Sequence, residues 1–186
     1  MTDHHVDQGG GAAIVELLVD MERRAWRAAE MLPVLHEHAS NWDGLIYRLG
    51  GYSIATPLDE VAEILDHMPV LTPVPGVSFW VAGIANVRGN ILPVIDLEGF
   101  FLDAPIERSR RTRVLIVQDD GGQIGLMVND VGGMRHFPLE TRADADPVPA
   151  PLTAYVDSMF KGEQENYLIL SLRALASSAE FQMAAV

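Results

Sequence analysis

The sequence predicts a mainly β protein built from small barrels. Two segments rich in β-branched residues are each interrupted by a glycine pair, the first over residues 45–56 and the second over residues 113–128. Paired glycines supply the positive φ angles of a tight primed turn, so each segment is expected to form a hairpin. In both, an aspartate stands eight residues after the second glycine, at Asp59 and Asp130. The two hairpins therefore suggest a duplicated β unit, and short strands with frequent glycine and proline are typical of small barrels.

The first 40 residues show no strand pattern. Residues 1–11 are polar and contain three consecutive glycines, which predicts a flexible tail. From Ala12 onward, apolar residues recur at steps of three and four, which predicts a helix that Pro33 ends or kinks. We therefore divide the chain into a tail (1–11), an N-terminal helical extension (12–40) and a β domain (41–186). The apolar stripe of the helix consists of Ile14, Leu17, Leu18, Met21, Ala25, Ala28, Leu32 and Leu35.

Further strands and a closing helix are expected downstream. Residues 59–65 are ambiguous, because their apolar spacing suits either a helical turn or a strand. The composition between Pro138 and Pro151 predicts an exposed connection, and the tail from Leu172 to Met183 predicts a short C-terminal helix. The remaining strand candidates are Asn90–Leu97, Gly132–Phe137 and Asn166–Leu170.

An uncharged run of 20 residues extends from Met68 to Val87. Its length fits a membrane span, but Pro69, Pro73 and Pro75 would leave carbonyl groups unpaired in lipid. We interpret the run as a buried loop-and-turn segment of a protein that does not insert into the membrane. The N-terminus shows no basic segment followed by an apolar one, so no secretory signal is expected and the predicted location is the cytoplasm.

The composition excludes several classes of chemistry. The chain has 26 acidic and 13 basic residues, a net charge of −13, and no cysteine. Disulfides, thiolate metal sites and a cysteine nucleophile are therefore impossible, and a general nucleic-acid binder is disfavoured. The single lysine, Lys161, does not stand in a phosphate-binding loop. No cofactor and no metal site are expected.

Two charge clusters invite a functional interpretation. Asp59, Glu60 and Glu63 precede His67, and such acids could serve a small-ligand protein or a metal-dependent hydrolytic enzyme, although a solvated face is the favoured explanation. Four arginines stand within six residues, and we interpret them as a solvated loop or a site for an acidic protein partner. These four are Arg108, Arg110, Arg111 and Arg113.

Arg88 is the first charged residue after the uncharged run. A lone guanidinium among small and apolar residues either pairs internally or is presented outward. An internal partner would be Glu63 or Asp96, whereas an outward arginine framed by apolar surface is typical of the centre of a protein interface. Residue chemistry alone leaves both alternatives open.

The stretch around Arg88 resembles the CheW-like family of bacterial chemosensory coupling proteins. The hallmark is a small-residue turn with Asn-x-Arg-Gly, here Asn86 to Gly89, followed by an Ile/Leu-Pro-x-x-Asp-Leu strand, here Leu92 to Leu97. The resemblance covers Trp42 to Ala176, which makes residues 41–186 a CheW-like domain. Gly99-Phe100 and the N-terminal helix resemble the PilI-type branch, which belongs to type IV pilus twitching-motility systems.

The resemblance implies a fold of two intertwined five-stranded, SH3-like barrels over a shared hydrophobic core. It also implies a non-catalytic adaptor that couples the cytoplasmic tip of a methyl-accepting chemoreceptor to the regulatory domain of a CheA-like histidine kinase, close to the membrane in receptor arrays. Glu98 and Ser171 depart from the family pattern, which bears on the charge of the partner surface. The residues that match the partner-contacting strip of the family are Val61, Glu63, Ile64, Asn86, Val87, Arg88 and Gly89.

Overall fold

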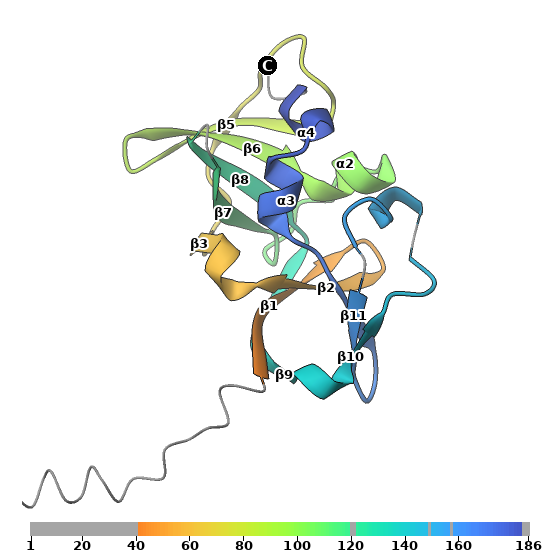
Figure 1. Ribbon diagram of the computed structural model, residues 1–186. Helices are drawn as coiled ribbons and strands as arrows, with labels where there is room; N and C mark the ends of the chain where they lie inside the picture. The colour runs from red at the N-terminus through yellow and green to blue at the C-terminus, as the bar shows by residue number, and fades with distance from the viewer. Residues whose placement is uncertain (1–40, 120–121, 149, 157, 184–186) are drawn as a thin grey trace, which may run out of the picture. The chain divides into compact units, whose positions relative to one another are not determined.

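The computed structural model describes residues 41–119, 122–148, 150–156 and 158–183 (Figure 1). The predicted tail (1–11) and helical extension (12–40) lie outside the described residues, and the proposed domain division stays a prediction. Among the described residues, no helix is long and apolar enough to cross a membrane.

The described strands form two six-stranded sheets, so the fold is mainly β as predicted. The first sheet has the order β10 (Arg142–Asp144), β11 (Ser158–Lys161), β12 (Asn166–Ile169), β2 (Tyr52–Pro57), β1 (Asn41–Leu49) and β9 (Asp130–Pro138). The second sheet has the order β3 (Val61–Leu65), β7 (Arg113–Asp119), β8 (Gly122–Val128), β6 (Asn90–Asp96), β5 (Val81–Val87) and β4 (Leu71–Thr72). The resemblance implied five strands per barrel; the hydrogen-bonding pattern gives six, including the very short β4 and β10.

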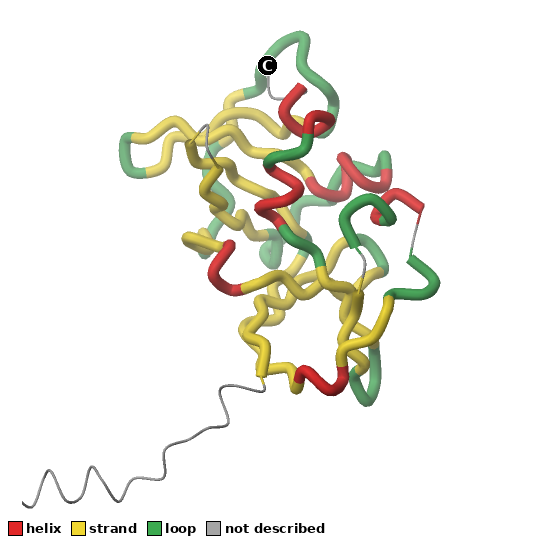
Figure 2. Tube along the Cα trace, viewed as in Figure 1, coloured by secondary structure: helices red, strands yellow, loops and turns green. Residues whose placement is uncertain are grey.

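Short helices lie between the strands and after the last of them. The 3-10 helices are η2 (Leu58–Glu60), η3 (Leu139–Thr141) and η4 (Ala150–Leu152). The α-helices are α2 (Leu97–Leu102), α3 (Leu172–Ala176) and α4 (Ala179–Met183). Figure 2 shows these three α-helices close together beside the second sheet, where α3 contacts β7 and α2 contacts β6 and β8.

The chain is built from two similar halves that exchange strands. Residues 41–102 run from β1 through β6 to α2, and residues 113–176 run from β7 through β12 to α3. The hairpin β1–β2 of the first half joins four strands of the second half, while β7–β8 joins four strands of the first half. In each sheet the halves meet at one parallel pair, β12 with β2 or β6 with β8, and at one antiparallel pair, β1 with β9 or β3 with β7. This exchange is what intertwines the two barrels.

The hydrophobic residues form one large shared core and a smaller cluster for each sheet. The shared core includes Leu45 and Tyr47 from the first sheet, Leu115 and Leu126 from the second, and Phe181 from α4. The second sheet also encloses a cluster around Leu92, Val94 and Met127, and the first encloses one around Phe137 and Phe160. A core shared by both sheets agrees with the arrangement implied by the resemblance.

Both glycine-paired hairpins are confirmed, as β1–β2 and β7–β8. The ambiguous segment 59–65 contains both structures. Residues 59–60 belong to the 3-10 helix η2, and residues 61–65 form strand β3. The predicted C-terminal helix is divided at Ser177-Ser178 into α3 and α4. The exposed connection from Pro138 to Pro151 contains the short strand β10.

The prediction that the uncharged run is a buried loop was wrong in two respects. The run contains β4 and all of β5, and two of its apolar side chains are largely exposed: Val70 at 89% and Phe79 at 59%. Strand β5 was missed because small residues such as Gly83 and Ala85 occupy its inward positions, which weakens the alternating pattern.

Candidate functional site

The motif around Arg88 forms the tip of the β5–β6 hairpin. Val87 pairs with Asn90, so Arg88 and Gly89 are the two central residues of the turn. Their φ angles are 52° and 88°, and positive values at both positions are typical of a type I′ turn. The Asn86 side-chain oxygen accepts a hydrogen bond from the Gly89 N–H at 2.9 Å, which closes the turn.

Arginine is an unfavourable residue at this position. A left-handed conformation costs a side chain with a Cβ about 1–2 kcal/mol, and asparagine or glycine is preferred at the first central position of a type I′ turn. Since Arg88 adopts φ 52° there, the turn itself does not explain the arginine. A strained conformation of this kind points to a role for the side chain that is independent of the backbone.

The Arg88 guanidinium makes a two-pronged ion pair with Glu63 of β3, with N–O distances of 2.8 and 2.7 Å. Asp96, the other suggested partner, is buried and caps α2 through the Gly99 N–H at 2.9 Å. The ion pair is nevertheless exposed, with 75% of the Arg88 side chain and 33% of the Glu63 side chain accessible. Arg88 therefore satisfies both alternatives at once, because it pairs within the chain and is also presented outward.

A surface hollow of about 360 Å³ lies between β3 and the hairpin. Five of the seven predicted site residues line it: Glu63, Ile64, Asn86, Val87 and Arg88. The predicted set missed four other lining residues, namely Leu65, Asp66, His67 and Pro69. These residues closely follow Ile64 in the sequence, and extending the predicted strip along the chain past the end of β3 would have included them.

The two remaining predicted residues flank the hollow without lining it. Gly89 completes the turn, where its positive φ of 88° requires glycine or a residue tolerant of that conformation. Val61 begins β3, and its partly buried side chain packs against the shared core. The structure thus brings five residues of the predicted strip to one hollow, while Val61, like Ile64, packs against the shared core.

Exposed apolar side chains adjoin the hairpin tip. Asn86 is paired with Ile91, and Leu71 is paired with Ala85, so Val70 is next in register to Asn86. Ile91 is 74% exposed and Val70 is 89% exposed. Because Leu92 and Val94 point inward, strand alternation alone could have placed Ile91 outward. The ion pair therefore stands beside exposed apolar surface.

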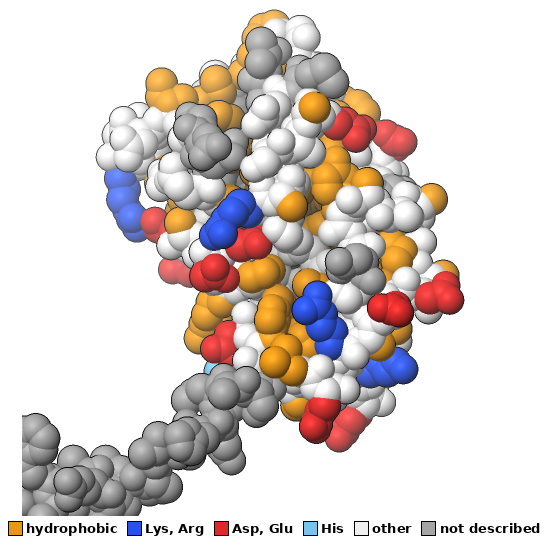
Figure 3. All heavy atoms as spheres, in the orientation of Figure 1, with side chains coloured by type: hydrophobic (Ala, Val, Ile, Leu, Met, Phe, Trp, Pro, Cys, Tyr) orange, Lys and Arg blue, Asp and Glu red, His pale blue; other side chains and the backbone are white. Residues whose placement is uncertain are grey.

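The acidic residues of η2 and β3 are held by different partners. Figure 3 shows acidic side chains gathered over η2 and β3. Glu60 accepts hydrogen bonds from the Ser171 hydroxyl at 2.8 Å and the Arg173 N–H at 3.0 Å, and Asp59 lies 3.8 Å from the Arg173 guanidinium. Only Glu63 and His67 of the suggested enzyme set line the hollow. No group of three or more metal-ligating side chains occurs among the described residues.

Glu98 and Ser171, the two departures from the family pattern, have structural roles. Glu98 is buried, and its carboxylate accepts from the Gly50 N–H and the Asn129 side-chain amide. Ser171 caps α3 by accepting from the Ala174 N–H at 3.1 Å. Both side chains are thus directed at the chain's own polar groups.

Burial raises the pKa of the Glu98 carboxyl above its ordinary value of 4.5, although the hydrogen bond from Gly50 acts in the opposite direction. The folded chain therefore binds this proton more tightly than the unfolded chain. By linkage, the contribution of Glu98 to stability is fully present below pH 4.5 and is lost as the pH rises through the raised pKa.

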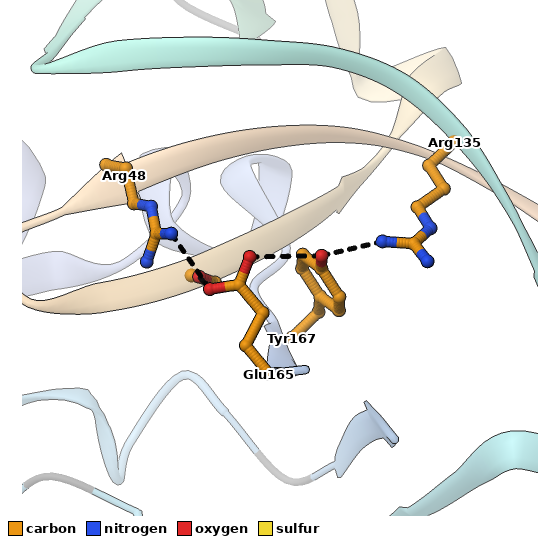
Figure 4. A network of polar contacts seen from close by, with 5 residues as sticks. Arg48, Arg135, Glu165 and Tyr167 are labelled. Carbon is orange, nitrogen blue, oxygen red and sulfur yellow. Dashed lines mark hydrogen bonds and ion pairs between the residues drawn. The ribbon is translucent and has the colours of Figure 1, made fainter. Parts of the chain in front are cut away.

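The first sheet holds a corresponding polar network (Figure 4). Arg48 pairs with Glu165 at 2.9 Å, the Tyr167 hydroxyl donates to Glu165 at 3.1 Å, and Arg135 donates to that hydroxyl at 2.6 Å. The hydrogen bond from Ser53 is the main cause that lowers the pKa of Glu165. Strand β9 and the β11–β12 hairpin occupy the places of β3 and the β5–β6 hairpin, but the arginine that pairs with Glu165 lies on β1, and Arg135 of β9 reaches Glu165 only through the Tyr167 hydroxyl.

Comparisons with known proteins agree with this geometry. Residues 43–180 match the family model of the CheW-like domain. The chain belongs to the CheW-like family. It is 40% identical to Protein PilI of Pseudomonas aeruginosa over 92% of this chain and 96% of that protein. It is 30% identical to Protein FrzA of Myxococcus xanthus over 57% of this chain and 62% of that protein.

The fold has a solved relative of the same family. The crystal structure of the scaffolding protein TtCheW from Thermoanaerobacter tengcongensis superposes with a TM-score of 0.65 at 25% identity, covering 75% of this chain and 94% of that one. The resemblance to the CheW-like family and its PilI-type branch is thus confirmed. Proteins of this family are non-catalytic scaffolds with a chemosensory coupling role, so the alternative of a hydrolytic enzyme was wrong.

Proposed function

We propose that this CheW-like chain couples the cytoplasmic tip of a chemoreceptor to the regulatory domain of a CheA-like histidine kinase in the cytoplasm. The 40% identity to PilI over nearly the whole chain supports a system that controls type IV pilus twitching motility. Two surfaces would be needed, one for each partner, and a chain of two intertwined barrels offers them on one body.

The observation that carries the proposal is the presentation of Arg88. Its guanidinium stands at the apex of a two-residue turn, 75% exposed, and is held by both oxygens of Glu63. Arginine held in position beside apolar surface is typical of residues that dominate binding energy, because little side-chain freedom is lost on binding. We assign Glu63, Ile64, Asn86, Val87, Arg88 and Gly89 to the partner-binding surface, with Val61 at its inner margin.

The proposed mechanism involves no chemistry on the chain. Receptor conformation would alter the fit at one surface, and the shared core would transmit the change to the surface that holds the kinase. A coupling free energy of about 1–3 kcal/mol between the two sites is enough for such regulation. The core suits this role because residues of both sheets, such as Leu45 and Leu115, pack in the same cluster.

The proposal is tested by reconstitution with purified components. The full chain, a receptor cytoplasmic fragment and the kinase regulatory domain are mixed, and capture of the kinase domain on immobilised receptor is measured. Kinase is expected to be captured only when the chain is present. Arg88→Ala is expected to weaken the binding of a partner by about 2 kcal/mol, or roughly 30-fold, with a melting temperature near that of the wild type.

Lys161→Ala is the matched control, because Lys161 is an exposed cation on β11 of the first sheet. It removes the same charge and is expected to leave capture unchanged. Capture of kinase without the chain, or equal capture by the wild type and Arg88→Ala, would contradict the proposed role of this surface.

A further inference from the structure

The segment between α2 and β7 carries the densest positive charge of the chain. Arg108, Arg110, Arg111 and Arg113 stand within six positions, whereas the whole chain has a net charge of −13. We call Arg108–Arg113 the arginine loop. Neither the hairpin tip nor the hollow beside Arg88 includes any of these residues.

One of the four arginines holds the loop together. The Arg113 guanidinium donates to the Arg110 carbonyl at 2.7 Å and to the Thr112 carbonyl at 3.0 Å. The Ser109 N–H donates to the Thr112 hydroxyl at 2.8 Å, and the Thr112 N–H returns a bond to the Ser109 carbonyl at 3.3 Å. Ser109 to Thr112 is therefore a closed turn with Arg110 and Arg111 at its centre.

Both ends of the loop are anchored. Upstream, the buried Ile106 donates its N–H to the capping aspartate Asp96 at 2.8 Å. Downstream, Thr112 is buried and Arg113 pairs with Val128 as β7 begins. The backbone is thus fixed before any partner arrives, which lowers the entropy lost on binding.

Three exposed arginines lie in this turn or immediately before it. Arg108, Arg110 and Arg111 are exposed, and in the part of the chain that the structure describes, the guanidinium groups of Arg108 and Arg110 have no hydrogen bond or ion pair. Arg111 lies 3.6 Å from Asp130 with 79% of its side chain accessible. An exposed ion pair of this kind contributes at most about 1 kcal/mol, so Arg111 remains available to a stronger partner.

We propose that the arginine loop is a recognition site for a short acidic segment of a partner protein. A guanidinium presents a planar fork that matches a carboxylate in two parallel hydrogen bonds, and three such forks lie within the arginine loop, whose two ends are anchored. A membrane or a nucleic acid is an extended polyanion that also meets the surrounding acidic surface of a chain with net charge −13. A short segment stays within the reach of the loop, since screening limits charge effects to about 8 Å at physiological salt.

The test uses the full chain and two fluorescein-labelled peptides, one of alternating glutamate and glycine and one with glutamine in place of glutamate. Binding is measured by fluorescence anisotropy. The triple variant Arg108→Gln, Arg110→Gln, Arg111→Gln is compared with the corresponding triple lysine variant, and Lys161→Gln serves as the control elsewhere. Vesicles containing phosphatidylglycerol and a single-stranded DNA oligonucleotide compete in separate arms.

The wild type is expected to prefer the glutamate peptide, with a loss of at least roughly 10-fold in the glutamine triple variant and an intermediate loss in the lysine triple variant. The control variant is expected to bind as the wild type does. Equal binding of both peptides, or retained binding by the glutamine triple variant, overturns the proposal. So does displacement of the peptide by the vesicles or the DNA at lower concentration than by unlabelled glutamate peptide. These outcomes are independent of the reconstitution test, which probes the Arg88 surface.

Discussion

The substitution Arg88→Asn separates the binding role of Arg88 from its structural role. Asparagine is preferred where Arg88 now adopts a φ angle of 52°, so relief of the left-handed penalty of about 1–2 kcal/mol favours the variant. Loss of the exposed ion pair with Glu63 lowers the free energy of unfolding of the variant by at most about 1 kcal/mol. The free energy of unfolding is therefore expected to stay within about 1 kcal/mol of the wild type, or to rise.

The same substitution is expected to abolish most of the partner affinity. Truncation of a central interface arginine costs about 2 kcal/mol or more, which is roughly 30-fold in Kd. Isothermal titration of the kinase regulatory domain, and separately of the receptor fragment, measures the affinity. Thermal unfolding followed by circular dichroism in the same buffer measures stability, where about 1 kcal/mol corresponds to about 2–4 °C for a chain of this size.

A double-mutant cycle with Glu63→Gln measures how much the ion pair itself contributes. The coupling free energy between Arg88 and Glu63 in unfolding experiments is expected to be below about 1 kcal/mol, as for other exposed pairs. The reasoning would be refuted by the opposite pattern, in which Arg88→Asn lowers stability by more than about 3 kcal/mol while both affinities are unchanged. Lys161→Asn controls for the loss of one positive charge.

Two further predictions concern the interior of the molecule. Val61→Glu is expected to reduce receptor capture and to lower the unfolding free energy by about 1–3 kcal/mol, because the carboxylate would enter the margin of the shared core. The exposed neighbour Ala62 provides the control Ala62→Glu, and equal capture by both variants would remove Val61 from the surface. Glu98→Gln is expected to keep the contact with Gly50 and to abolish the fall in stability that accompanies ionisation of Glu98 as the pH rises above 4.5. Denaturant titrations at several pH values check this, and an unchanged pH slope would show that Glu98 is not its source.

The elements that the sequence predicted correctly are those with local signals. Gly50-Gly51 and the alternating residues around it specify the β1–β2 hairpin without reference to the rest of the chain. Strand β6 was also predicted, because its own run of apolar residues indicates a strand. Helix α2 was missed because it has only six residues and depends on the Asp96 cap and on burial of Phe101. Strand β11 was missed as well, because its only apolar residues, Met159 and Phe160, are adjacent and give no alternating pattern.

The pairing of the halves could not be predicted from local pattern. The duplicated hairpins were visible, but nothing near β1 in the sequence indicates that its outer neighbour is β9. Likewise, β3 follows the first hairpin in the chain and yet pairs with β7 of the second. Asp59 and Asp130, noted for their equal spacing from the glycines, lie where the chain passes from one sheet to the other.

The ion pair at Arg88 could be predicted from the sequence better than the hollow beside it. The motif identified Arg88 and the strip on β3, and the ion pair with Glu63 was one of the two alternatives considered. Those alternatives were treated as exclusive, whereas an exposed pair satisfies both. The arrangement of the hollow depends on bringing β3 beside the β5–β6 hairpin, which are joined only through the order of the second sheet. The spacing of residues along the sequence does not show that β3 and this hairpin lie close together in space.

Glu98 and Ser171 show how the two halves are held in one arrangement. At the first passage between the sheets, Glu60 of η2 is bound by Ser171 and by the backbone of α3, which belongs to the second half. At the second passage, Asn129 is bound by Glu98 of α2, which belongs to the first half. Each segment that crosses between the sheets is therefore held by a hydrogen bond to the helical region of the other half. A movement of one sheet relative to the other would break or strain both contacts, so these contacts oppose independent motion of the two barrels.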